Sequence, residues 1–144
     1  MMTIEFYFDD QLENTLIAIF KQGWTWQDYL STTDILLTYP PNLALPHGTR
    51  VDLIMDFRLT THLPTDGVGT VNVIKARDKK LQHTCGQIPR EGGIIINVGN
   101  PIFISAMLRT FGVEMPPKLA KERIAPSLEK AREAIRQHRI EMRA

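Results

Sequence analysis

Residues 93–98 (GIIINV) form a nearly all-apolar run, and residues 51–57 (VDLIMDF) form a second run that is almost as apolar. Short runs of this kind are typical of strands that other elements cover on both faces. The chain between them includes a segment that can form a crossover helix, the connection that parallel strands require. The two runs therefore predict the middle of a mixed, mostly parallel sheet in an α/β domain.

The N-terminal residues predict a hairpin that extends this sheet. Residues 3–8 alternate apolar and polar side chains, and Thr15–Phe20 (TLIAIF) is a short run of strand-forming residues. The polar link between them, residues 9–14, is too long for a two-residue turn, so we expect a wider loop.

The first helix has a clear start and stop in the sequence. Thr25 can accept hydrogen bonds from the amides of the first turn, and Asp28 takes the position of a capping-box glutamate. Pro40 and Pro41 cannot continue a helix and are expected to end it.

Two further helices are predicted after the strand at residues 51–57. The β-branched side chains of residues 68–80 favour a strand, but apolar residues also recur there at helical spacing, and the crossover requires a helix. For the last helix of this part, Asn100 is a good N-cap, Pro101 suits the first position and Gly112 suits the end. The predicted order is β-β-α-β-α-β-α with four strands.

The composition excludes several classes of protein. With 144 residues, 43% hydrophobic residues and a net charge of +1, the chain resembles one globular domain and not a disordered, collagen-like or coiled-coil protein. Its single cysteine, Cys85, excludes an internal disulfide framework. Uncharged residues 92–108 fall short of the ~20 residues of a membrane helix, and the N-terminus does not resemble a signal peptide. We expect a cytoplasmic protein that neither inserts into membranes nor binds nucleic acid.

The end of the chain has a different charge from the rest. Residues 118–144 carry 8 basic and 4 acidic side chains, a formal charge of +4, whereas residues 1–117 carry 9 and 12, a charge of −3. Apolar residues recur there at helical spacing, which predicts an amphipathic helix broken at Pro126, with the stripe Ile124, Leu128, Ala131 and Ile135. This stripe must be covered, and we expect a homodimer through the helix, with docking onto its own domain as the alternative.

Three segments together resemble the small bacterial STAS-like proteins, relatives of the anti-sigma factor antagonists. They are residues 23–26 (GWTW), residues 51–58 (VDLIMDFR), and residues 94–99 (IIINVG) with the helix that follows. The resemblance implies a four-stranded STAS-like domain over residues 1–115, with residues 116–144 as a C-terminal helical extension. It also implies a non-catalytic regulatory domain that binds a protein partner and needs no cofactor.

The same resemblance implies a partner-binding loop. In the antagonists a strand ends in an Asp-Leu-Ser type sequence, and a kinase phosphorylates the Ser of a following Asp-Ser-x-Gly at a helix start. Residues 56–58 (DFR) fall on the first motif and residues 64–67 (PTDG) on the second, with Pro in place of Asp and Thr in place of Ser. The residues implied are Asp56, Arg58, Thr65, Asp66 and Gly67, with Thr65 as the phosphoacceptor.

The residues themselves support two interpretations of Thr65. A phosphate there would face the free amides and the positive end of a helix, although Asp66 would repel it. The simpler interpretation is a threonine that caps the helix.

Other candidate chemistry is weaker. His83 and Cys85 are only two of the about four ligands that a closed zinc site needs, so no metal site is predicted. Asp52 and Asp56 share one face of a strand and could form a carboxylate pair, or Asp56 could orient the loop after it. The chain has no nucleotide-binding or hydrolase motif, and we expect no enzyme.

The sequence allows two interpretations of Trp24 and Trp26. They either frame a pocket for an apolar ligand or belong to the core. The sequence therefore favours a regulatory protein-interaction domain. The alternatives are a small carrier of apolar ligands or lipids, and a phosphoswitch that acts at Thr65.

Overall fold

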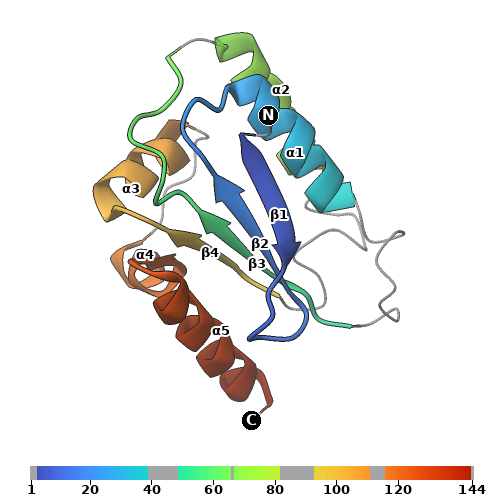
Figure 1. The fold of residues 1–144 in the computed structure, drawn as a ribbon, viewed down its shortest axis with the longest axis vertical. Coiled ribbons are helices and arrows are strands. Elements are labelled where there is room, and N and C mark those ends of the chain that lie inside the picture. Colours follow the sequence, from blue (N-terminus) through green and yellow to red (C-terminus); the bar gives the residue numbers. More distant parts are fainter. Residues whose placement is uncertain (1–2, 39–48, 66, 82–92, 111–115, 144) are drawn as a thin grey trace.

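The computed structural model describes residues 3–38, 49–65, 67–81, 93–110 and 116–143. Within them, five strands form one sheet in the order β1-β2-β3-β4-β5 (Figure 1). They are β1 (Ile4–Phe8), β2 (Thr15–Phe20), β3 (Asp52–Asp56), β4 (Ile95–Val98) and β5 (Ile124–Ala125). β1 is antiparallel to β2, and the other neighbouring strands are parallel. The prediction of a mixed, mostly parallel α/β sheet is confirmed.

Helices lie on both sides of this sheet (Figure 1). They are α1 (Trp26–Thr38), α2 (Val68–Leu81), α3 (Pro101–Thr110), α4 (Pro117–Arg123) and α5 (Leu128–Arg143). α1 and α2 lie side by side on one face, and α5 lies on the other. The ambiguous segment after β3 is therefore helical, as the crossover argument predicted. None of the described helices combines the length and the apolar character needed to cross a membrane.

Two helix starts are built as predicted. The Asp28 N–H donates to Thr25 Oγ1 over 3.1 Å, and the Thr25 N–H donates to Asp28 Oδ2 over 3.0 Å, which forms a reciprocal capping box. At α3, Asn100 Oδ1 accepts a 2.8 Å hydrogen bond from the Ile102 N–H. The features expected to end these helices lie outside the described residues, namely Pro40, Pro41 and Gly112.

The predicted count of four strands is wrong by one. Ile124 and Ala125, expected within a broken C-terminal helix, instead form β5, which pairs with Asn97 and Val98 of β4. Two residues are too few to produce a recognisable alternation, so the helical spacing around them concealed the strand. Residues after 116, expected as an extension beyond the sheet, thus contribute its fifth strand and a covering helix.

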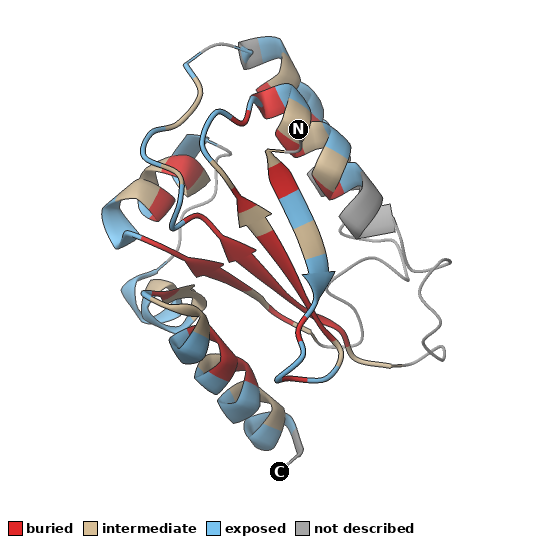
Figure 2. Cartoon of the chain, viewed as in Figure 1, coloured by how far each residue is buried: buried red, intermediate tan, exposed pale blue. Residues whose placement is uncertain are grey.

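The sheet separates two apolar cores, because successive side chains of a strand point to opposite faces. The inner strands β2, β3 and β4 are coloured mainly as buried in Figure 2. The tryptophan-side core lies under α1, α2 and α3 and includes Phe20, Trp24, Leu53, Phe57 and Met107. The α5-side core includes Ile17, Ile54, Ile96, Ala131 and Ile135. Because β2 and β3 contribute to both cores, they are buried along almost their whole length.

α5 is fastened to the sheet by ion pairs as well as by apolar contacts. Arg132 Nε donates to Asp9 Oδ2 over 2.8 Å, and Arg139 Nη2 donates to Asp52 Oδ2 over 2.8 Å. On the same helix, Ala131 and Ile135 are fully buried against the chain's own strands. The stripe that led us to expect a homodimer is thus covered within one molecule, which is the docked alternative.

The Asp9–Arg132 pair is buried at the end of the β1 strand. Burial by itself would raise the pKa of Asp9, but hydrogen bonds from Arg132 and from the backbone of Gln11, together with the Arg132 charge, hold it below its ordinary value of 3.8. A carboxyl with a lowered native pKa stabilises the fold above its unfolded pKa. This contribution is present at neutral pH and is lost as the pH falls below 3.8.

We predict that Arg132→Ala lowers the free energy of unfolding by about 3 kcal/mol, because it leaves the Asp9 carboxylate buried without its partner. Arg136→Ala is the matched control on the same helix, since its guanidinium is half exposed and lies 3.8 Å from Glu129. It should cost less than about 0.5 kcal/mol. Urea unfolding at neutral pH measures the free energy of unfolding of both variants. If the two variants lose equal amounts of stability, the buried pair has no special role in holding α5.

Candidate functional site

Residues 57–65, which we call the 57–65 loop, follow the carboxyl end of β3 and lead towards α2. In open α/β sheets, the loops at the carboxyl ends of parallel strands are the usual place for binding. Most residues that the resemblance assigned to a partner-binding loop lie on this loop or next to it. Asp66 alone among them lies outside the described residues.

Asp56 holds the beginning of the loop. Its Oδ1 accepts hydrogen bonds from the Arg58 backbone N–H at 3.0 Å and from Arg58 Nε at 2.9 Å, and its Oδ2 accepts one from Arg58 Nη2 at 2.8 Å. The side-chain bonds and the charge of Asp56 raise the pKa of the Arg58 guanidinium above its ordinary value. The interpretation of Asp56 as an acceptor that orients the loop is confirmed.

Two indole groups hold the rest of the loop. Trp24 Nε1 donates a 3.0 Å hydrogen bond to Thr60 Oγ1, which in turn donates to the Phe20 carbonyl. Trp26 Nε1 donates a 3.2 Å hydrogen bond to the Pro64 carbonyl. The middle of the loop is therefore attached to the turn after β2, and its end is attached to the first residue of α1.

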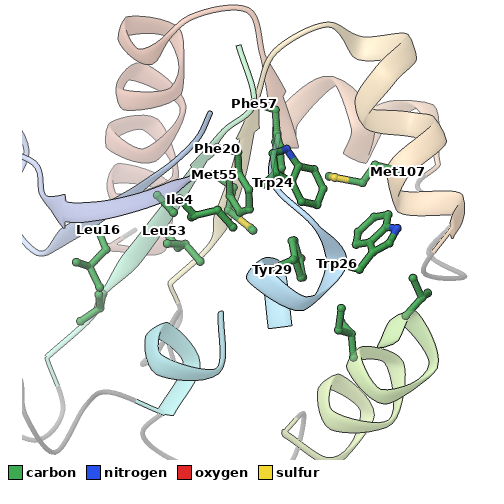
Figure 3. Packing of buried hydrophobic residues seen from close by; sticks show 14 residues of the cluster. Ile4, Leu16, Phe20, Trp24, Trp26, Tyr29, Leu53, Met55, Phe57 and Met107 are labelled. Carbon is green, nitrogen blue, oxygen red and sulfur yellow. The ribbon is translucent and has the colours of Figure 1, made fainter. Parts of the chain in front are cut away.

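The two tryptophans belong to the core. Each indole is only 4% exposed, and their ring centroids lie 5.1 Å apart in an edge-to-face arrangement (Figure 3). Phe20 stacks on Phe57 at 4.3 Å, and Tyr29 contacts both tryptophans. Of the two interpretations left open by the sequence, the core interpretation therefore describes Trp24 and Trp26, and their faces are occupied by other side chains.

The outer side of the 57–65 loop faces solvent. Its exposed side chains are Arg58, Leu59, Thr61, His62 and Thr65. Leu59 is 53% exposed. The loop therefore presents one apolar, one cationic and several hydroxyl or imidazole groups on a backbone that the core fixes.

Thr65 does not cap α2. The Val71 N–H donates a 3.0 Å hydrogen bond to the Gly67 carbonyl, so Gly67 occupies the N-cap position. Gly67 has φ +89°, a left-handed conformation that glycine adopts without strain. The N-cap interpretation of Thr65 is wrong because the cap is provided by backbone geometry two residues later, which leaves the Thr65 side chain exposed.

The buried carboxylates are engaged by arginines and not by one another. Asp52 contacts Arg50 and Arg139, whereas Asp56 contacts Arg58, so the shared strand face does not produce a carboxylate pair. No group of three or more His, Cys, Asp or Glu among the described residues could hold a metal ion. His83 and Cys85 lie outside those residues.

A second polar group lies at the opposite end of β3, and we call Arg50, Asp52, His138 and Arg139 the Asp52 cluster. Asp52 is fully buried and accepts hydrogen bonds from both arginines and from the Ile94 N–H at 2.8 Å. These residues lie up to 89 positions apart in the sequence, from Arg50 to Arg139, and no motif connects them. A usable signal existed, because an aspartate inside an apolar strand needs a cation, and the basic residues after position 118 supply one.

Comparison of the chain with protein-family models, with curated proteins and with solved structures finds no match.

We predict that Trp26→Phe loosens the 57–65 loop without disturbing α5. The substitution keeps the aromatic contact with Trp24 but removes the donor to the Pro64 carbonyl, a loss of about 1 kcal/mol. Backbone amide spectra should show changes at residues 58–65 and unchanged signals at residues 129–140. Uniform changes along the chain, or none in the loop, would contradict the anchoring role of the indole.

Proposed function

We propose that this chain is a non-catalytic regulatory domain that binds another protein through the 57–65 loop. The observation that carries the proposal is the contrast between the two sides of the loop. Its inner side is fastened by Asp56, Trp24 and Trp26, and its outer side exposes Leu59 and Arg58. A STAS-like relationship, as the sequence suggests, is consistent with this role.

A fastened loop favours binding for a physical reason. A partner that docks on a flexible loop must order it, which costs binding free energy, whereas a preorganised loop avoids most of that cost. Arginine is enriched in protein interfaces, and an exposed leucine adds apolar area at the centre of such a patch. Arg58, like any arginine, is charged at all physiological pH values, and the hydrogen bonds to Asp56 raise its pKa further.

The carrier and enzyme alternatives have less support from the described residues. The two tryptophans that could have lined a ligand pocket are packed against Phe20, Tyr29 and one another. The buried carboxylates that could have acted as acids or bases are each held by an arginine.

The phosphoswitch remains a second candidate for this same loop. Thr65 is exposed and lies two residues before the N-cap of α2, so a kinase could reach its hydroxyl. A phosphate at this point would add about two negative charges near the positive end of a helix.

The interaction proposal predicts that Leu59→Glu abolishes capture of a specific partner from a lysate of the native organism. The matched control is Ile140→Glu, an equally drastic change at a 60% exposed residue of α5, far along the chain from the loop. Both variants should keep wild-type stability, since surface changes usually cost less than about 0.5 kcal/mol. Proteins bound by the wild type are compared by mass spectrometry, and a partner lost with both variants or with neither would refute binding through this loop.

The phosphoswitch makes its own prediction at Thr65. Incubation of the chain with ATP and a lysate of the native organism should place a phosphate on Thr65, and Thr65→Ala should remove it. Thr61→Ala, at another exposed threonine of the same loop, serves as the control and should keep the modification. Phosphate only at other sites, or none at all, would exclude the switch and leave the binding proposal standing.

A further inference from the structure

The contact between Arg50 and His138 fixes the protonation state of the histidine. Arg50 Nη2 lies 2.8 Å from His138 Nδ1. A guanidinium has only donors and stays charged, so Nδ1 must accept, and the histidine proton sits on Nε2. Protonated His138 would instead place two donors and two positive charges against each other at this distance.

The surroundings of His138 also favour its neutral form. Burial lowers the pKa of His138, and the positive charges of Arg50, before β3, and of Arg123, on α4, lower it further. Asp52 on β3 and Glu141 on α5 oppose this effect, but the pKa remains below its ordinary value of 6.5. Arg139, the next residue of α5, is occupied by Asp52 and by the Glu13 carbonyl.

We infer that the Asp52 cluster is an acid-sensitive latch, in which protonation of His138 breaks its contact with Arg50 and loosens the C-terminal half of α5 from β3. The structural basis is the position of the histidine. His138 and Arg139 lie on the same turn of α5, so a shift of this turn away from Arg50 also strains the 2.8 Å contact between Arg139 and Asp52.

The two halves of α5 should respond to different ranges of pH. The unlatched state binds the His138 proton more readily than the latched state, so the latch weakens as the pH falls through 6.5 and is weakest below the pKa of the latched histidine. The N-terminal half is held by Asp9 and Arg132, and this pair persists until the pH falls below 3.8. Mild acid should therefore loosen the C-terminal half of α5 and leave its N-terminal half in place.

Nuclear magnetic resonance on the full chain tests this directly. Near pH 7.5, the ring nitrogen shifts of His138 should show a neutral ring protonated at Nε2, and its titration midpoint should lie below the ordinary histidine value of 6.5. Between about pH 7.5 and pH 5, amide exchange protection of residues 136–142, corrected for the intrinsic rate, should fall roughly threefold or more, while residues 129–133 keep theirs.

Two variants complete the test. His138→Asn keeps an acceptor near the Nδ1 position but cannot titrate, so the loss of protection at residues 136–142 should disappear. His62→Asn, at an exposed histidine of the 57–65 loop, is the control and should retain it. The latch is overturned if His138 titrates at or above 6.5, if both halves of α5 respond alike, or if His138→Asn retains the response. Should His138→Asn fail to fold, the wild-type titration and exchange decide alone.

Discussion

The fold depends on the burial of three aspartates beside arginines. Asp52 and Asp56 lie at the two ends of the central strand β3, and Asp9 follows β1, all three with almost no exposed surface. A buried carboxylate without a partner costs several kcal/mol, so each one specifies where an arginine must lie. Arg139 and Arg132 meet Asp52 and Asp9, and in doing so they set the position of α5 along the sheet.

The same constraint shapes the 57–65 loop. Asp56 holds Arg58 at the point where β3 ends, and the tryptophan-side core then holds Thr60 and Pro64 through two indole donors. Aromatic packing and loop conformation are therefore coupled, because Trp24 and Trp26 contribute both core area and hydrogen bonds. The loop is therefore held by the core through Thr60 and Pro64 and by the Asp56–Arg58 pair at its beginning.

Much of the fold could be predicted from local signals. The apolar runs that became β3 and β4 identified the centre of the sheet, and the Thr25 and Asn100 caps marked the starts of α1 and α3. These predictions succeeded because strand burial and helix capping depend on residues close together in the chain. The loop at the end of β3 was implied by the resemblance to the STAS-like proteins, through residues 56–58 and 64–67.

The chain by itself determined its α/β class, its central strands and the loop that follows β3, since each depends on neighbouring residues. Only the tertiary structure decided that Ile124 and Ala125 pair with β4, that α5 covers its own sheet, and that Arg50, Asp52 and His138 meet. The Arg50–His138 contact joins residues 88 apart, and the Asp9–Arg132 contact that holds α5 joins residues 123 apart. Ion-pair partners and the pairing of a two-residue strand leave no periodic pattern in a sequence, because they are fixed by packing in three dimensions.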